Sequence, residues 1–244
     1  MNSQEILLWV ALPYIAIATF STGLWWRYRY DKFGWTTRSS QVYEVNILRI
    51  ASPLFHLGML AVVGGHVIGL LIPETWTHAL GISEGTYHLV AVSLGALSGL
   101  GTLLGITLLV YRRRMTQSVF VATTKNDKLM YVFLLSTIIL GLATTLVGSG
   151  IVGDAYNYRE TVSPWFRSIL LFNPKPELMA ASLPSFQIHA VAGMLLFMLW
   201  PFTRLVHAFS APIMYFFRPY IVYRSRGDHV SGSRQPRRGW NGFN

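Results

Sequence analysis

The sequence predicts an all-α membrane protein built as a bundle of five transmembrane helices. The chain has 244 residues, of which 52% are hydrophobic and only 12% are charged, a composition too apolar for an ordinary soluble domain. Five apolar stretches reach the length of about 20 residues that a bilayer-spanning helix needs. Basic residues are concentrated in alternate connections between these stretches, as is typical of multi-pass proteins.

The five predicted spans cover residues 6–26, 47–72, 87–111, 129–152 and 185–217. The first follows Glu5, the only charged residue among the first 26. It lacks the basic segment that opens a signal peptide, so we interpret it as a retained helix. Residues 1–224 are predicted to form the membrane domain. Residues 225–244, rich in Gly, Ser and Arg, are predicted to form a disordered basic tail.

The charge distribution predicts the orientation of the bundle. Sixteen of the 20 basic residues lie in the connections 27–49 and 112–128 or in the segment after residue 217, and such basic segments stay on the cytoplasmic side. The N-terminus is therefore predicted to lie outside the plasma membrane and the C-terminus in the cytoplasm. This topology explains the net charge of +10, so the charge does not indicate nucleic-acid binding.

The connection 153–183, on the predicted outer side, contains a further helical pattern. Trp165, Ile169 and Phe172 recur at helical spacing after a Ser-Pro pair, which favours a short helix lying in the membrane interface. An irregular segment held at the membrane by its aromatic side chains is the alternative.

Four histidines lie inside apolar spans: His56 and His66 in the second span, His189 and His207 in the fifth. Ionisable groups in hydrocarbon are costly and usually serve a function. The two spans run antiparallel in the predicted topology. This places His56 with His207 near the inner surface and His66 with His189 near the outer surface, as two facing pairs at two depths.

Paired imidazoles without a nearby carboxylate suit a metal that takes neutral nitrogen ligands. Haem iron accepts one axial ligand from each side of the porphyrin, so the two pairs predict two b-type haems with two histidine ligands each. The chain has no cysteine, which excludes covalent haem attachment and iron–sulfur clusters ligated by this chain. With both axial positions filled, the predicted work is electron transfer.

Residues near the four histidines fit this interpretation. Gly65 and Gly69 lie beside the second histidine of the second span, and Gly193 lies one turn from the first histidine of the fifth; their missing side chains would admit a porphyrin. Arg112 and Arg204 lie at the predicted inner ends, where they are predicted to bind haem carboxylates. Close helix packing explains the glycines equally well, and membrane anchoring the arginines.

The histidine spacings of 10 and 18 residues present a geometric difficulty. On ideal helices they correspond to separations of about 15 Å and about 27 Å along the axis. Two straight helices with parallel axes cannot bring both histidine pairs together across distances that differ this much. Pro201 lies between the histidines of the fifth span and predicts a kink that shortens the longer distance.

The chain resembles the gamma subunit, a dihaem cytochrome b, of membrane-bound respiratory nitrate reductases over nearly its whole length. The resemblance is carried by "PYIA", "WWRYRYDKFGW", "RSSQ", "LFHLGML", "GGHVIGLL", "LSG", "RRR", "VFVATT" and "IHAVAGMLLFMLWPFTRLVHAFSAPIMY", of which "PFTRLVH" is the most specific. It implies that His56 and His207 bind the inner haem, and that His66 and His189 bind the outer one.

The resemblance also implies a function. Members of the family oxidise menaquinol or ubiquinol beside the outer haem and release the protons outside. They pass electrons on the cytoplasmic side to an iron–sulfur beta subunit and then to a molybdenum alpha subunit that reduces nitrate. Gly65 and His66 would line the quinol pocket. Some members have a lysine at the outer start of the third span, where this chain offers Tyr87 and His88 to the quinol pocket. The candidate proton acceptors are His88, Asp154 or a group that hydrogen-bonds to a haem ligand.

Two alternatives remain open at this point. One is the dihaem cytochrome b subunit of another quinone-linked oxidoreductase, of the heterodisulfide or sulfite-reduction type. The other is a cofactor-free transporter or anchor in which the histidines relay protons. Copurifying subunits would distinguish the first alternative, and a b-type optical spectrum would exclude the second.

Overall fold

The computed structural model describes residues 2–31, 34–35, 40–148 and 155–210, and these residues form helices without any strand. This confirms the all-α fold class. The chain divides into two units, residues 1–210 and 211–244, and every described residue belongs to the first. The end of the fifth predicted span, the predicted tail 225–244 and Asp154 lie outside the described residues, so the domain boundary after residue 224 stays a prediction.

Within the described residues, five helices are long and apolar enough to cross a membrane, as the hydropathy pattern predicts. The first joins α1 (Ser3–Ile6), a π-helical turn η1 (Leu7–Ala11) and α2 (Leu12–Tyr30), and the others are α3 (Leu48–Leu71), α5 (Glu84–Met115), α7 (Lys125–Gly148) and α10 (Pro184–Leu199) with the 3-10 turn η2 (Trp200–Phe202). The third helix extends three to four residues past its predicted span at each end.

Four short helices connect the spans: α4 (Glu74–Ala79), α6 (Gln117–Val121), α8 (Val162–Leu170) and α9 (Pro176–Ala180). Only α8 was predicted. Trp165 and Ile169 are buried on it, and the Trp165 indole N–H donates to the Trp9 carbonyl at 2.9 Å. Phe172 lies beyond the end of α8, with φ at 55° and its side chain exposed. Two of the three residues of the predicted face therefore pack against the protein.

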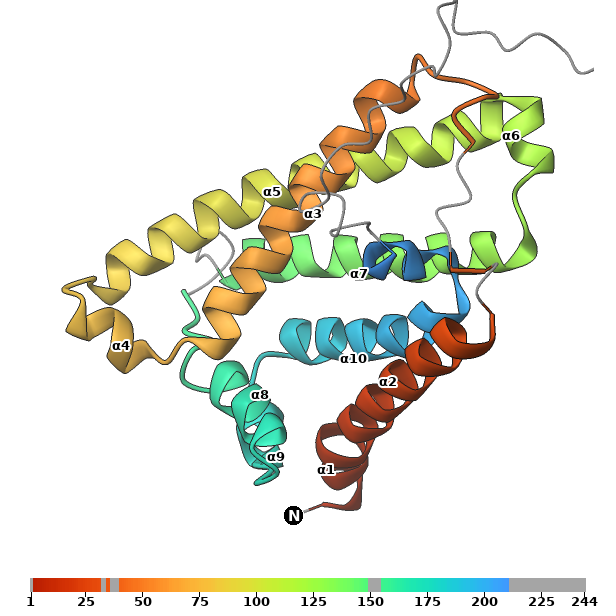
Figure 1. Ribbon diagram of the computed structural model, residues 1–244. Helices are drawn as coiled ribbons and strands as arrows, with labels where there is room; N and C mark the ends of the chain where they lie inside the picture. The colour runs from red at the N-terminus through yellow and green to blue at the C-terminus, as the bar shows by residue number, and fades with distance from the viewer. Residues whose placement is uncertain (1, 32–33, 36–39, 149–154, 211–244) are drawn as a thin grey trace, which may run out of the picture. The chain divides into compact units, whose positions relative to one another are not determined.

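Helix packing separates the two elements that carry the predicted histidine pairs. α3 packs along α5, whereas α10 packs against α7 and α2, and α3 with α10 is not among the closely packed pairs (Figure 1). α3 and α5 approach each other closely at Gly105, where an added Cβ atom would lie only 2.5 Å from the Phe55 backbone nitrogen. Small residues allow such close approach between membrane helices.

The fifth span is broken where the sequence predicts only a kink in a continuous helix. α10 ends at Leu199, and Thr203 is extended, with φ −118° and ψ 178°. A second 3-10 segment, η3 (Arg204–Phe209), follows the break. Pro201 cannot donate a backbone hydrogen bond and its ring clashes with the preceding turn, which accounts for the end of the helix. His207 therefore lies on η3 and not on the helix that carries His189.

Glu44 ties the connection before α3 to the C-terminal part of α5. Its carboxylate accepts from Arg112 Nε at 2.5 Å, and the Arg112 side chain is only 1% exposed. Partial burial acts to raise the pKa of Glu44, but hydrogen bonds from the Ile47 N–H and from Arg112 outweigh it, so the pKa lies below its ordinary value. The carboxylate is therefore charged at neutral pH.

Replacing Glu44 with Gln is expected to lower the unfolding temperature of the detergent-solubilised protein, because buried Arg112 loses its charged partner. A carboxylate whose pKa is lowered on folding stabilises the fold at neutral pH, and this contribution disappears as pH falls below about 4. The difference between wild type and E44Q should therefore shrink in acid. Glu5→Gln is the control, since Glu5 only accepts from the exposed Asn2 N–H; equal effects of both variants would contradict the prediction.

Candidate functional site

The structure brings the four histidines together as two facing pairs. The ring centres of His56 and His207 are 6.0 Å apart, and those of His66 and His189 are 6.1 Å apart. α3 contributes one histidine to each pair, while η3 and α10 contribute the other two. These are the two pairs that the sequence predicts to face one another.

Backbone carbonyls orient three of the four imidazoles. Nδ1 of His56 donates to the Ser52 carbonyl at 2.7 Å, Nδ1 of His66 to the Val62 carbonyl at 2.8 Å, and Nδ1 of His207 to the Arg204 carbonyl at 2.6 Å. A carbonyl oxygen only accepts, so Nδ1 carries the proton of each neutral ring. Nε2 is left with a free lone pair, the arrangement that metal-binding histidines adopt.

The fourth histidine, His189, packs closely against α7. Its Nδ1 is buried without a hydrogen-bond partner. A Cβ atom placed on Gly141 of α7 would lie 2.8 Å from Cε1 of the ring, so only a glycine leaves room for the imidazole. Gly141 was not predicted, because hydropathy does not show which face of a fully apolar helix meets another side chain.

The spacing within each pair fits an iron atom between two imidazoles. Two metal–nitrogen bonds of about 2 Å each, added to the distance from each nitrogen to its ring centre, give a separation on the order of 6 Å. No described hydrogen bond joins the two rings of either pair. The donor set of two neutral imidazoles per site is that of a b-type haem.

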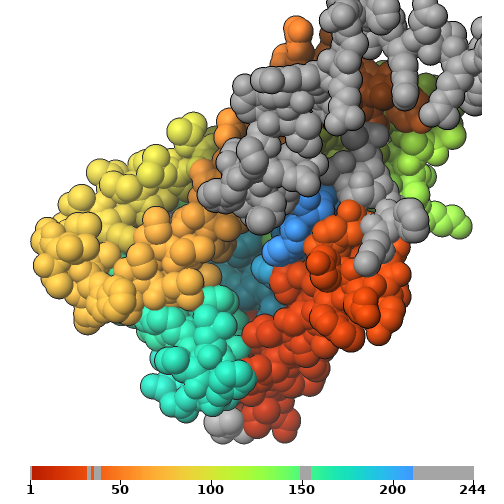
Figure 2. Space-filling view, in the orientation of Figure 1, coloured from red at the N-terminus to blue at the C-terminus, as the bar shows by residue number. Residues whose placement is uncertain are grey.

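The predicted glycines fall into two groups. A Cβ atom on Gly65 or on Gly193 would meet no other atom within 4 Å, whereas one on Gly69 would lie 2.7 Å from the Tyr158 hydroxyl. The space at Gly69 thus receives a tyrosine, which corrects its assignment to a porphyrin. Figure 2 shows a recess between α3 and α2 with the surface of α10 at its bottom.

The two predicted arginines are both engaged with carboxylates. Arg112 donates to Glu44 and Ser40 through four of its five N–H groups, so its guanidinium is committed to the connection before α3. Its predicted contact with a haem carboxylate stays a prediction. Arg204 binds both oxygens of Asp127, at 2.7 Å and 3.2 Å, and retains further N–H groups that no described contact uses.

One of the candidate quinol residues, Tyr87, lies in a polar network at the end of the bundle that carries α4 and α8. The Tyr87 hydroxyl is 3.2 Å from the Tyr158 hydroxyl, and the guanidinium of Arg159 lies 3.9 Å from the Tyr87 ring centre. Burial, reinforced by the hydroxyl of Tyr87, raises the pKa of Tyr158. Tyr87 is thus already partnered, whereas the buried Nε2 of His88 has no hydrogen-bond partner.

Arg159 organises this network, and the sequence analysis did not single it out. Its buried side chain donates to Glu84 and to the Thr77 hydroxyl, both at 3.0 Å. Glu84 also belongs to a group with Glu74 and His78 whose ligand atoms lie within 4.8 Å of one another. The ion pair with Arg159 already compensates the charge of Glu84, which weakens this group as a cation site.

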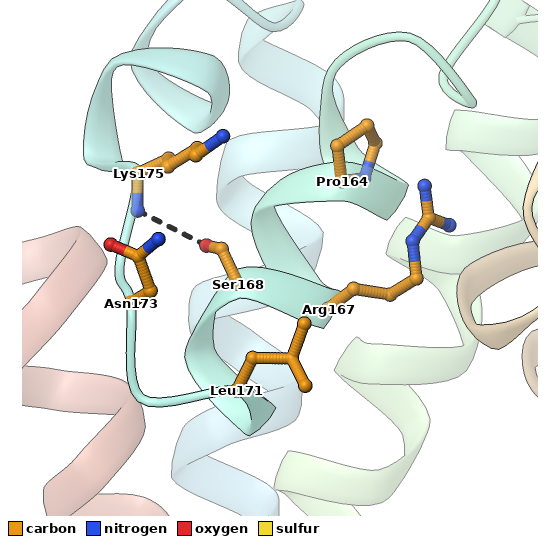
Figure 3. A pocket seen from close by; sticks show the side chains of 6 residues that line it. All are labelled: Pro164, Arg167, Ser168, Leu171, Asn173 and Lys175. Carbon is orange, nitrogen blue, oxygen red and sulfur yellow. Dashed lines mark hydrogen bonds between the residues drawn. The ribbon is translucent and has the colours of Figure 1, made fainter.

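A shallow depression on α8 lies apart from the histidines (Figure 3). It is lined by Pro164, Arg167, Ser168, Leu171, Asn173 and Lys175. Figure 3 shows the Arg167 guanidinium directed away from Lys175, and it donates to the Leu70 carbonyl at 3.0 Å. Burial and neighbouring Arg159 lower the pKa of Arg167. The two positive charges do not converge, so the depression has no focused anion site.

Comparisons with known proteins identify relatives along the whole membrane region. A family model described as nitrate reductase gamma subunit matches residues 5–226. The nitrate reductase-like protein NarX of Mycobacterium tuberculosis is 60% identical, over 96% of this chain and 36% of that protein. The nitrate reductase gamma chain of Bacillus subtilis is 44% identical, over 90% of this chain and 98% of its own length.

A third relative is the respiratory nitrate reductase 2 gamma chain of Escherichia coli, which is 37% identical over 88% of this chain and 94% of its own length. The chain therefore corresponds to nearly all of the two gamma chains. It spans about a third of the length of the mycobacterial relative.

Replacing Gly141 with Ala is expected to displace the His189 ring, because the new Cβ would lie within 3 Å of it. We expect b-type haem content to fall by up to half, with the loss confined to the His66–His189 site. Haem extraction and the optical spectrum measure the change. Gly95→Ala on α5 is the matched control, since its Cβ would make an ordinary 3.6 Å contact with Thr145; unchanged haem in G141A would contradict the prediction.

Proposed function

Because the chain belongs to the nitrate reductase gamma subunit family, we propose that it is the membrane cytochrome b subunit of a respiratory nitrate reductase. In this proposal it binds one haem b between His56 and His207 and a second between His66 and His189. It oxidises menaquinol or ubiquinol near the outer face of the plasma membrane and passes the electrons inward.

The observation that carries this proposal is the pair geometry. Two imidazole pairs recur at the same separation, 6.0 and 6.1 Å, on elements that do not pack closely together. Three of the rings present an unprotonated Nε2. A histidine with a purely structural role needs only one hydrogen-bond partner, and Nδ1 of these three rings has one. The Nε2 lone pairs that remain free in the two pairs are suited to bind a metal ion.

When bound, haem b supplies one-electron transfer. The chain's own residues do the rest. The two histidines of each pair would hold the iron and leave no place for oxygen or substrate on it, and the apolar helices would exclude water. Oxidation of a quinol also releases two protons, and a neutral imidazole accepts one at ambient pH. His88 is the described candidate, because its Nε2 has no other partner.

Gly65 would let a quinol ring approach the α3 backbone beside His66, since a Cβ there meets nothing. Tyr87 would act indirectly, through Tyr158, because its hydroxyl already contacts that side chain. Protons released at the outer face and electrons passed to the cytoplasmic side would separate charge across the membrane.

The partners follow from the proposed function. An iron–sulfur beta subunit and a molybdenum alpha subunit on the cytoplasmic side would receive the electrons and reduce nitrate, and the lipid bilayer surrounds the five spans. The names of the two gamma chains support such a complex. The segment "RPYIVYRSR", on the predicted cytoplasmic side, would face the soluble partner; it lies outside the described residues.

Purified protein is expected to contain two b-type haems per chain. Replacing His56 or His207 with Ala should remove one of them, and replacing His66 or His189 should remove the other, because each iron loses an axial ligand. Pyridine haemochrome and reduced-minus-oxidised spectra measure this. His78→Ala is the control, since the described side-chain hydrogen bond of His78 is to Glu74 and not to a paired histidine; a colourless wild-type protein would refute the proposal.

Replacing Gly193 with Leu tests where the porphyrin lies. A Cβ atom there would meet no protein atom within 4 Å, and Gly193→Ala is therefore the matched control for folding. We expect haem content to fall, because the leucine would occupy the space of the macrocycle. Gel filtration in detergent monitors folding. Full haem content in a folded G193L protein would place the porphyrin elsewhere.

A further inference from the structure

The two histidine pairs differ in how their second member is held. His189 lies within the regular helix α10, whereas His207 lies on η3, after the break at Pro201. A short 3-10 segment next to a break has few internal hydrogen bonds of its own. Some other part of the chain must therefore fix the position of His207.

The N-terminal turn of α7 supplies that support. Asp127 binds the Arg204 side chain through both carboxylate oxygens, at 2.7 Å and 3.2 Å. The neighbouring Asn126 amide donates to the Phe202 carbonyl. Both contacts reach the residues on either side of Thr203, where the backbone is extended. The break is thus clamped from α7 at two consecutive positions.

Asp127 is itself rigidly placed. One carboxylate oxygen accepts from the Thr124 N–H at 3.0 Å, and the Asp127 N–H donates to the Thr124 hydroxyl at 3.1 Å. This reciprocal pair caps α7. The Asp127 residue is only 2% exposed, so little solvent competes for its carboxylate.

We propose that Asp127 is a positioning residue for His207, an inference that rests on the proposed haem-binding function. Arg204 joins the two, because its side chain binds Asp127 while its carbonyl accepts from Nδ1 of His207 at 2.6 Å. The carboxylate fixes Arg204, the Arg204 carbonyl fixes the imidazole plane, and Nε2 is directed at His56. No described contact of Asp127 reaches the His66–His189 pair.

The ion pair between Asp127 and Arg204 also determines the net charge near His207. Arg204 carries a positive charge three residues from His207, and Asp127 neutralises it. Without the carboxylate, the cation would stabilise the reduced state of the nearby haem, which has one positive charge fewer than the oxidised state. Asp127 therefore controls both ligand geometry and reduction potential at one site only.

The test is Asp127→Asn in the full complex, with both haems followed by redox titration and by low-temperature EPR of the oxidised protein. We expect the His56–His207 haem to shift to higher potential, with a changed or broadened low-spin signal. The other haem should keep its potential and signal. Asp127→Glu retains the charge and should restore the potential in part.

Glu44→Gln is the matched control, because it too removes the carboxylate partner of a buried arginine, Arg112, but contacts no residue of η3. It should lower stability without shifting one haem selectively. Asn126→Ala, which removes only the bond to Phe202, should cause a smaller change at the same haem and serves if Asp127→Asn does not fold.

The outcomes separate the inference from the function on which it rests. A wild-type complex without haem overturns both. Two haems in wild type that are unchanged in D127N and N126A overturn the inference alone. Equal shifts of both haems, or the same pattern in E44Q, would show a general structural role and also overturn it.

Discussion

The arrangement depends on the hydrogen bond from a histidine Nδ1 to a backbone carbonyl three or four residues earlier, which three of the four paired histidines make. It is local, so it forms wherever the helix forms. It removes one of two tautomers and turns the other nitrogen outward. Without it, an imidazole in an apolar span would have two nitrogens to satisfy and no fixed direction.

The fold converts these local bonds into two pairs by holding α3 and the fifth span apart. α3 packs on α5, and α10 packs on α7 and α2. A shared apolar cluster, with Phe55 from α3, Ile106 from α5, Leu134 from α7 and Leu205 from η3, connects the layers near the His56–His207 pair. Because α3 packs on α5, α5 on α7 and α7 on α10, α5 and α7 set the distance between α3 and the fifth span.

The sequence predicted what local periodicity and antiparallel topology determine: the five spans, the short helix α8 and the partners within each histidine pair. It could not predict the break after Leu199, because a proline in a helix can either kink or end it. The contacts of Asn126 and Asp127 beside the break join residues that lie 76 and 77 positions apart in the sequence. The partner of Arg112 was also out of reach, since Glu44 is 68 residues away.

Glycines show the same limit in a different form. Gly65, Gly69, Gly141 and Gly193 look alike in an apolar helix, yet an added Cβ would meet nothing at two of them, a tyrosine hydroxyl at Gly69 and a histidine ring at Gly141. Hydropathy indicates that a helix lies in lipid, but it does not indicate which neighbouring side chain a given residue contacts. Only the tertiary arrangement separates a glycine that admits a ligand from one that admits a side chain.

Each pair is tied to the polar network nearest to it. Tyr158 fills the space at Gly69, one turn from His66, and the Ser163 hydroxyl donates to the Gly69 carbonyl at 2.8 Å, so the segment before α10 fixes the end of α3. At the other pair, Asp127 fixes Arg204. No described contact links the two networks, and sites without shared partners respond independently to substitution. Each histidine pair is therefore expected to respond to substitutions in the polar network at its own end more than to those at the other end.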